Sequence, residues 1–157
     1  MSALVEFVKP TPALLSSIAC NMREADRVEI WASHNQTPEN SVFEGVEISD
    51  YVSIALINGE PAALFGLVIT NILASTGVPW LLGTNLMDDH KRVIVRYAHI
   101  LTQQMNSKCH NLVNYVHTKN RKSIRLLKAV GFTVDDAAPY GVEGELFHMF
   151  HRENEDV

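Results

Sequence analysis

Residues 111–132 read NLVNYVHTKNRKSIRLLKAVGF and contain the clearest structural pattern in the chain. Four apolar residues within 112–116 predict a short buried strand. Asn120 then fits the N-cap of a helix. The apolar positions of this helix recur at helical spacing: Ile124, Leu126, Leu127 and Val130. Gly131 fits the left-handed position that ends a helix, so the stretch predicts a strand, a capped amphipathic helix and a further strand.

Strand patterns on both sides of this stretch predict a sheet. Asn58-Gly59 is the strongest hairpin signal, because both residues tolerate positive φ. Gly66 lies inside an apolar strand and indicates a bulge or a close backbone approach. A last turn is expected at Pro139-Tyr140-Gly141. The expected strands outside 111–132 are Val5–Val8, Tyr51–Ile57, Pro61–Thr70, Val78–Leu82, Thr133–Ala138 and Glu145–His151.

Helical patterns occupy three further regions. Thr11-Pro12 is an N-cap followed by proline, and the apolar pattern after it continues to Ala32 as one bent helix or two. Residues 34–45 predict a loop with a short helix over Val42 and Phe43. The main helix is expected from Asp88 or Asp89 to about Ser107. Its apolar face would carry Val93, Ile94, Tyr97, Ile100, Leu101 and Met105.

Together these elements predict an α+β, three-layer fold with the order β-α-α-β-β-β-α-β-α-β-β. The central sheet would be mixed and mostly antiparallel, with about six or seven strands and about four helices. We expect a single domain over residues 1–152 and a charged C-terminal tail over residues 153–157.

Composition narrows the possible partners. The net charge of −5 argues against nucleic acid as the main partner, although a local basic face remains possible. Cys20 and Cys109 provide no disulfide framework, and we expect both to be reduced in a cytosolic setting. We expect no signal peptide, and no apolar run approaches the length of a membrane span.

Two sets of residues carry a resemblance to known families. Asn120, Ser123 and Gly131-Phe132 stand at a spacing that resembles the last helix motif of the GNAT acetyltransferase superfamily. Residues 22–32 (MREADRVEIWA), 57–66 (INGEPAALFG) and 78–85 (VPWLLGTN) are similar to small tailed-phage proteins of the same fold. Some of those are internal virion or head-assembly proteins. This similarity implies phage structural proteins or a host protein as partner, and a location in the host cytoplasm or the packaged virion.

The resemblance to GNAT enzymes implies acetyl-CoA as cofactor, with its pyrophosphate at the turn before the main helix. The superfamily loop there has the pattern Q/R-x-x-G-x-G/A, whereas this chain has no glycine between Gly83 and Gly131. Asp88 and Asp89 would satisfy the helix dipole themselves and repel phosphate, so a plain acidic cap is the alternative. The candidate CoA cleft comprises Leu81, Leu82, Gly83, His90, Lys91, Arg92, Asn120 and Ser123.

Catalytic groups are less evident. Active relatives commonly place a tyrosine seven residues after the motif asparagine, as the acid for the departing thiolate. This chain has Leu127 there, which cannot transfer a proton. The proton of an amine would go to Glu60, His117 or water, and backbone amides near Leu81–Gly83 would polarise the carbonyl. Asn120 could equally be a plain helix cap.

Other chemistry has little support in the sequence. His148 and His151 lie three apart on a strand and so point to opposite faces, and no metal site is expected. The aromatic residues Trp31, Phe43 and Trp80 fit core or interface anchors.

Three functions therefore remain open. The first is a non-catalytic or vestigial GNAT-fold protein that acts in virion assembly through protein contacts, as an internal virion or head protein. The second is an active acetyl-CoA-dependent N-acetyltransferase, and the third is a regulator that binds acyl-CoA or another small ligand. Whether the chain is an enzyme, what its acceptor is and how it oligomerises are left open by the sequence, because fold alone does not decide function.

Overall fold

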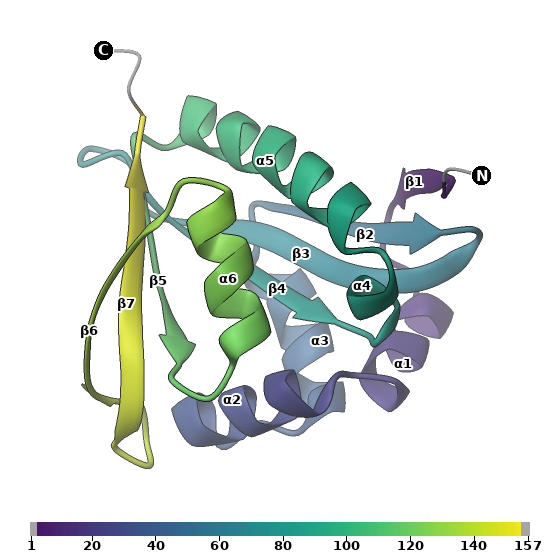
Figure 1. The fold of residues 1–157 in the computed structure, drawn as a ribbon, viewed down its shortest axis with the longest axis horizontal. Coiled ribbons are helices and arrows are strands. Elements are labelled where there is room, and N and C mark those ends of the chain that lie inside the picture. The colour runs from purple at the N-terminus through teal and green to yellow at the C-terminus, as the bar shows by residue number, and fades with distance from the viewer. Residues whose placement is uncertain (1–2, 155–157) are drawn as a thin grey trace.

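The computed structural model describes residues 3–154 and contains one seven-stranded sheet, in the order β1-β2-β3-β4-β5-β7-β6 (Figure 1). The strands are β1 (Val5–Val8), β2 (Tyr51–Ile57), β3 (Glu60–Asn71), β4 (Thr76–Gly83), β5 (Asn111–His117), β6 (Thr133–Tyr140) and β7 (Glu145–Glu153). The helices are α1 (Pro12–Cys20), α2 (Glu24–His34), α3 (Pro38–Ile48), α4 (Leu86–Asp89), α5 (Lys91–Lys108) and α6 (Arg121–Ala129).

The β2–β3 hairpin has the turn expected from its sequence. Asn58 and Gly59 have φ values of 51° and 82°, as a two-residue turn between twisted strands requires. Gly66 in β3 is a site of close approach, because a Cβ there would lie 2.7 Å from the Tyr51 carbonyl oxygen. The irregularity in the pairing of β2 with β3 lies elsewhere, between Ala55 and Leu56.

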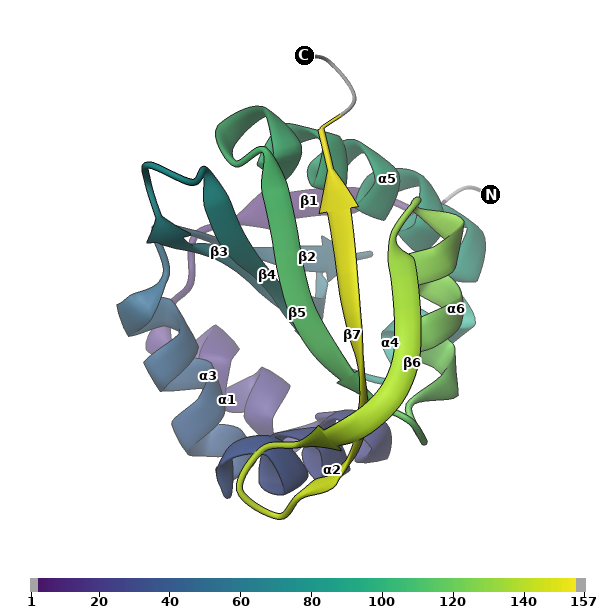
Figure 2. The same ribbon diagram turned by 90° about the vertical axis from the view of Figure 1, so that its left-hand side faces the viewer.

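The feature that positions the site is a split between β4 and β5. These parallel strands pair only at their first residues, Thr76 with Asn111 and Gly77 with Leu112. Beyond that point β4 pairs with β3 up to Gly83, while β5 pairs with β7 up to His117. The two halves of the sheet therefore diverge towards the carboxyl ends of β4 and β5 (Figure 2).

The helices form layers on the two faces of the sheet. Helices α1 and α3 cover one face, and α5 and α6 cover the other (Figure 2). Buried residues of α1 and α3 pack with β2, β3 and Leu82 in one core cluster. The other face has two clusters against which α5 and α6 pack. Helix α2 runs across the carboxyl ends of β4 and β5 (Figure 1).

Two helical expectations need correction. Residues 38–48 form a full helix, α3, rather than a short helix in a loop, because Thr37 caps it and Pro38 begins it. The main helix does not begin at Asp88 or Asp89. These residues belong to the short helix α4, which ends at Asp89; His90 separates it from α5, which starts at Lys91. The chain thus has six helices over its described part rather than about four.

Smaller differences occur on the surface and near the C-terminus. Ile100 was expected on the apolar face of α5, but it is 43% exposed. Strand β6 extends to Tyr140, so the last turn falls at residues 141–144. The charged tail expected over residues 153–157 begins later than predicted, because Glu153 still belongs to β7. Its last three residues, 155–157, lie outside the described residues. Within residues 3–154, no helix is long and apolar enough to cross a bilayer.

Candidate functional site

Three charged side chains of α2 and its N-cap reach the open end of the β4–β5 split. Arg23, Asp26 and Glu29 are spaced by three residues, which places them on one side of the helix. Arg23 and Asp26 are only 6% and 1% exposed. Burial of such groups is costly unless each is paired and hydrogen-bonded. Their partners therefore define what the site is built to hold.

Asp26 ties the two halves of the sheet together. Its Oδ2 accepts a hydrogen bond from the Gly83 amide at the end of β4 (2.8 Å), and its Oδ1 accepts one from Asn120 Nδ2 at the start of α6 (3.2 Å). Arg23 forms a bidentate pair with the same carboxylate, with both distances 3.1 Å. Gly83 and Asn120 are thus bridged by a buried ion pair.

Arg23 also connects the helices that flank the split. Its Nη2 donates to Ser123 Oγ in α6 (3.3 Å), and its Nη1 lies 3.6 Å from Asp88 Oδ1 in α4. The other oxygen of Asp88 pairs with Lys122 Nζ at 2.8 Å. Asp88 is therefore neutralised by two cations instead of capping the long helix.

The start of α5 consequently differs from the acidic cap suggested by the sequence. Its first turn contains no acidic residue, and no side chain caps it. Such a helix start leaves amide donors and the positive end of the dipole available to an anion. Lys91 and Arg92 are exposed there, and His90 precedes them.

Glu29 also lies at the split, and among the described residues its carboxyl group forms hydrogen bonds but no salt bridge. Its Oε1 accepts a hydrogen bond from the His117 amide (2.6 Å), and its Oε2 accepts one from Asn120 Nδ2 (3.3 Å). Burial is the main reason that the pKa of Glu29 is raised to about 8, and the nearby Asp26 charge adds to the rise. A carboxyl with such a pKa can exchange protons near neutral pH.

A cavity of about 640 Å³ passes beside Glu29 and through the split. On one side it is lined by α2 and α3, and on the other by the facing sides of α5 and α6. The cavity is open to solvent along part of its length, so water or a ligand can occupy it.

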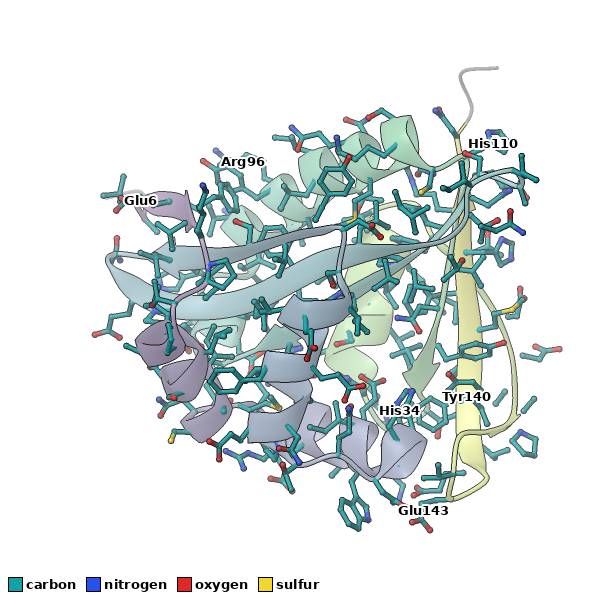
Figure 3. The ribbon with its side chains drawn as sticks, turned by 180° about the vertical axis from the view of Figure 1, so that it is seen from behind. Glu6, His34, Arg96, His110, Tyr140 and Glu143 are labelled. Carbon is teal, nitrogen blue, oxygen red and sulfur yellow. The ribbon has the colours of Figure 1, made fainter. Side chains whose placement is uncertain are left out.

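Aromatic residues surround the mouth of the cavity on the α2 side. Tyr115 and Tyr140 stack with ring centroids 3.8 Å apart, and Tyr140 also meets the edge of Phe147. Burial, and to a lesser extent Tyr115, raises the pKa of Tyr140. His34 also lines this mouth and lies near Tyr140 in Figure 3.

The structure gathers most of the candidate cleft residues around the split. Gly83, Asn120 and Ser123 belong to the Asp26 and Arg23 network. Leu81 and Leu82 line the cavity, as does Leu127 in the position where relatives carry tyrosine. His90, Lys91 and Arg92 lie where α4 is followed by α5, and they do not line the cavity.

The two candidate bases lie less favourably. Glu60 is exposed at the β2–β3 hairpin and does not line the cavity. The His117 ring is 2% exposed and has both nitrogens engaged. Nδ1 accepts from the Lys119 amide (3.2 Å), which leaves Nε2 to donate to Glu145 (2.9 Å). Only the backbone amide of His117 reaches the site, where it holds Glu29.

Sequence reasoning missed Arg23, Asp26 and Glu29. Their spacing already places them on one side of a helix, but charged residues in such a row usually face solvent. Nothing local indicates that this side faces the split, because the split itself arises from pairing between β4 and β5. Of the aromatic candidates, Trp80 packs against a core cluster, whereas Trp31 and Phe43 are exposed and lie outside the core.

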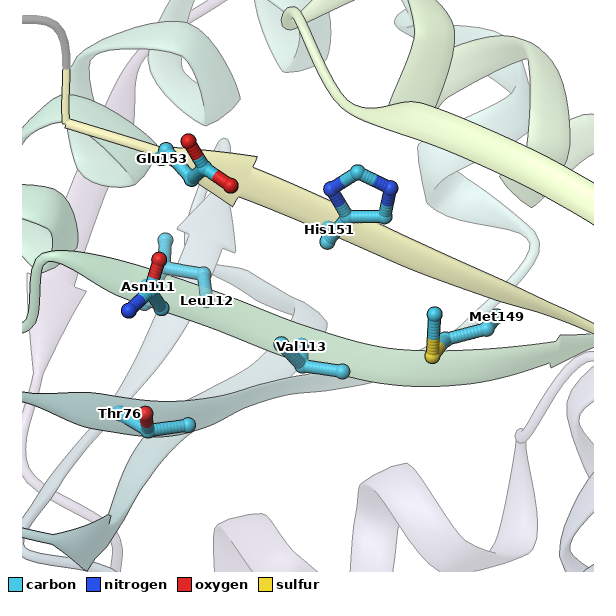
Figure 4. A pocket seen from close by; sticks show the side chains of 7 residues that line it. All are labelled: Thr76, Asn111, Leu112, Val113, Met149, His151 and Glu153. Atoms are coloured by element: carbon cyan, nitrogen blue, oxygen red, sulfur yellow. The ribbon is translucent and has the colours of Figure 1, made fainter. Parts of the chain in front are cut away.

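A second, smaller hollow of about 280 Å³ lies at the closed end of the β4–β5 pair (Figure 4). Its lining includes His151, whose Nε2 lies 3.2 Å from Asp135 Oδ1. His148 bonds instead to the Asp135 carbonyl oxygen (2.7 Å). Among the described residues, no group of three potential ligands could hold a metal ion.

Comparison with solved structures identifies the architecture. No protein-family model and no curated protein matches the chain. A ribosomal-protein-S5-alanine acetyltransferase from Vibrio fischeri matches 99% of this chain over 98% of its own, with a TM-score of 0.68 at 14% identity. A ribosomal L7/L12 α-N-protein acetyltransferase in complex with coenzyme A matches 98% over 96%, with a TM-score of 0.71 at 11% identity.

A third similar structure is a Salmonella typhimurium protein, described as a putative acetyltransferase with its cofactor acetyl-CoA. It matches 99% of this chain over 95% of its own, with a TM-score of 0.60 at 16% identity. At these identities the likeness concerns the fold alone. The chain has the GNAT fold, with a mixed seven-stranded sheet and six helices over its described residues.

Proposed function

We propose that this GNAT-fold chain is an N-acetyltransferase that uses acetyl-CoA. The observation that carries the proposal is Glu29, a carboxyl with a pKa of about 8 beside a cavity that passes through the β4–β5 split. The similarity to CoA-bound acetyltransferases supports the same choice of cofactor. In this proposal the thioester and the acceptor amine enter from opposite faces of the sheet, and a passage through the split would let them meet.

In this proposal the start of α5 holds the phosphates of the cofactor. The uncapped amides of its first turn, together with Lys91 and Arg92, supply positive potential. Arg23 and Lys122 pair with Asp88, which lessens the repulsion that the sequence suggests and leaves Asp89 as the exposed acidic residue there. The bound cofactor supplies the activated acetyl group, and the cavity around Leu81 and Leu82 would hold its thioester end.

Glu29 would act as the general base. An acceptor amine would enter past Tyr115 and Tyr140, and its proton would pass to the Glu29 carboxylate as nitrogen attacks the thioester carbonyl. The bound thioester would supply the acetyl group to nitrogen, and its thiolate would be the leaving group. Leu127 cannot protonate this thiolate, so its proton comes from solvent. The Gly83 amide does not polarise the carbonyl while Asp26 accepts its hydrogen bond.

A thermal shift measurement tests the proposal. A ligand that binds only the folded chain stabilises it by RT ln(1 + [L]/Kd), about 2.7 kcal/mol at one hundred times Kd. Acetyl-CoA should therefore raise the Tm, and thiol release in the presence of amines should follow. If millimolar acetyl-CoA does not change the Tm, both the acetyltransferase function and the function as an acyl-CoA-binding regulator would be contradicted. A shift without thiol release would favour the regulator.

A non-catalytic role in phage particle assembly is the second candidate. The bridge from Asp26 to Gly83 and Asn120 favours it, because these hydrogen bonds span the open end of the split, where a cofactor arm would have to pass. Exposed Trp31 and Phe43 offer apolar surface to a phage structural protein or host protein. This role places the chain in the host cytoplasm or in the virion. Mass spectra of purified particles test it, and absence of the chain from them would count against it.

A further inference from the structure

The cavity extends along α5 and α6, where the residues that line it are uncharged and mostly apolar. Residues of α1 and α3 belong to a buried core cluster. In contrast, none of the residues of α6 is fully buried. In α5 only Thr102 and Asn106 are buried. Protein interiors are normally packed as densely as organic crystals, so two amphipathic helices without a buried apolar side chain are unusual.

The side of these helices that faces the cavity carries no charge, whereas their charged residues lie on the other sides. The cavity is lined from α5 by residues that include Ile94, Ala98, Leu101 and Met105, and from α6 by Leu126 and Leu127. No charged side chain of either helix lines it. An apolar cavity of about 150 Å³ already binds benzene in preference to water, so this one suits a much larger apolar group.

The length of the lining fits a chain rather than a ring. Ile94 and Met105 are eleven residues apart on α5, which corresponds to about 16 Å along the helix axis. An extended chain advances about 3.5 Å for every three bonds, so this run corresponds to about 14 bonds and can accommodate a medium-length acyl chain. Ser123 and Glu29 provide polar groups where the cavity meets the β4–β5 split.

We propose that the cavity between α5 and α6 binds a medium-length acyl chain, so that the preferred thioester is an acyl-CoA longer than acetyl-CoA. This inference rests on the proposed function for the thioester end and on the cavity for the chain. Leu127 contributes to it, because leucine extends the apolar wall where a tyrosine would place a hydroxyl group.

Calorimetric titration of the full chain with acetyl-CoA, decanoyl-CoA and free decanoate tests the inference. Decanoyl-CoA should bind at least tenfold more tightly than acetyl-CoA. Ala98→Phe, which fills the cavity, should abolish that preference and leave acetyl-CoA affinity within twofold. Ala129→Phe is the matched control, because Ala129 is exposed on α6 and does not line the cavity. If Ala98→Phe does not fold, Ala98→Leu should reduce the preference by a smaller factor.

The outcomes separate the two proposals. Equal affinity for both thioesters would overturn the acyl-chain inference and leave the acetyltransferase proposal standing. Binding of decanoate alone, weakened by Ala98→Phe, would support the chain site and contradict the use of CoA. Failure of all three ligands to bind would overturn both.

Discussion

At the scale of single residues, Glu29 is the group whose chemistry is most altered by the fold. The backbone amide of His117 and the side chain of Asn120 hold its carboxyl in place, while burial favours its protonated form. These two influences oppose each other, and burial is the larger. The result is a carboxyl that changes charge near pH 8 instead of near pH 4.5.

The raised pKa of Glu29 predicts a pH dependence of stability. Between about pH 4.5 and pH 8 the folded chain holds a proton that the unfolded chain has lost, so stability falls as pH rises through this window. The contribution of Glu29 is at most about 1.4 kcal/mol per pH unit. Glu29→Gln should remove it, which urea unfolding of both proteins from pH 5 to pH 9 would measure. An unchanged difference between pH 5 and pH 8 would contradict the assignment.

The same substitution bears on catalysis. Glutamine keeps an oxygen that can accept the His117 amide, but it cannot take a proton from an amine. Loss of a general base typically lowers the rate by about 100-fold or more. Acetyl-CoA affinity should remain within a few-fold of wild type, which titration of the Glu29→Gln protein would check. A variant with full turnover would show that another group or water accepts the proton.

Asp26 is expected to matter more for stability than for chemistry. Removing one partner of a buried ion pair costs about 3–5 kcal/mol, because the other charge remains buried. Asp26→Ala should therefore lower the free energy of unfolding by that amount, and the double change Arg23→Met with Asp26→Leu should recover much of it. Lys122→Ala is the control, since its ion pair with Asp88 is exposed and worth less than about 1 kcal/mol. Equal effects of Asp26→Ala and Lys122→Ala would contradict this view.

At the scale of elements, the break between α4 and α5 changes how the phosphate region is understood. The sequence alone predicts that acidic residues lie at the start of one long helix. Such an acidic helix start would repel an anion. In the structure His90 interrupts the helix, and Asp88 turns towards Arg23 and Lys122. The interruption could not be predicted locally, because the partner of Asp88 comes from a segment 65 positions earlier in the chain.

The cations at the start of α5 provide a test of where the cofactor binds. Lys91→Glu and Arg92→Glu together should weaken acetyl-CoA binding at least tenfold and reduce its salt dependence, because exposed charges act through a screened field. Lys128→Glu is the control, since Lys128 is exposed in the last turn of a different helix, α6. Unchanged affinity in the double variant would show that the phosphates bind elsewhere.

Local signals predicted the elements well where capping and periodicity act within one segment. The Asn58-Gly59 turn, the Asn120 cap of α6 and the positive φ of Gly131 agree with the sequence. The helix α3 was underestimated because its apolar residues are few and its cap, Thr37, was the only strong signal. Element boundaries that depend on neighbours in space, such as the extension of β7 through Glu153, did not follow from the sequence.

At the scale of the whole molecule, the sheet consists of two halves that share only the first residues of β4 and β5. The order of the strands along the chain and the class of fold could be predicted, from hydrophobic patterns and from the resemblance carried by the motif around Asn120, whereas the order of the strands within the sheet was not predicted. The three α2 side chains at the split could not, because their inward orientation depends on how two distant strands diverge. Glu60 and His117 were predicted as candidate bases from their chemical type alone. In the fold it is Glu29 that lies beside the split.

The central claim is that the split between β4 and β5 is a thioester site with Glu29 at its edge. The most direct measurement is to follow the backbone amide resonances of the chain in solution by NMR while acetyl-CoA is added. We predict saturable changes at Leu81–Gly83, Lys91–Val93 and Ser123, with little change at Thr76 and Asn111 at the closed end. Unchanged resonances at millimolar acetyl-CoA, or changes confined to the closed end, would contradict the claim.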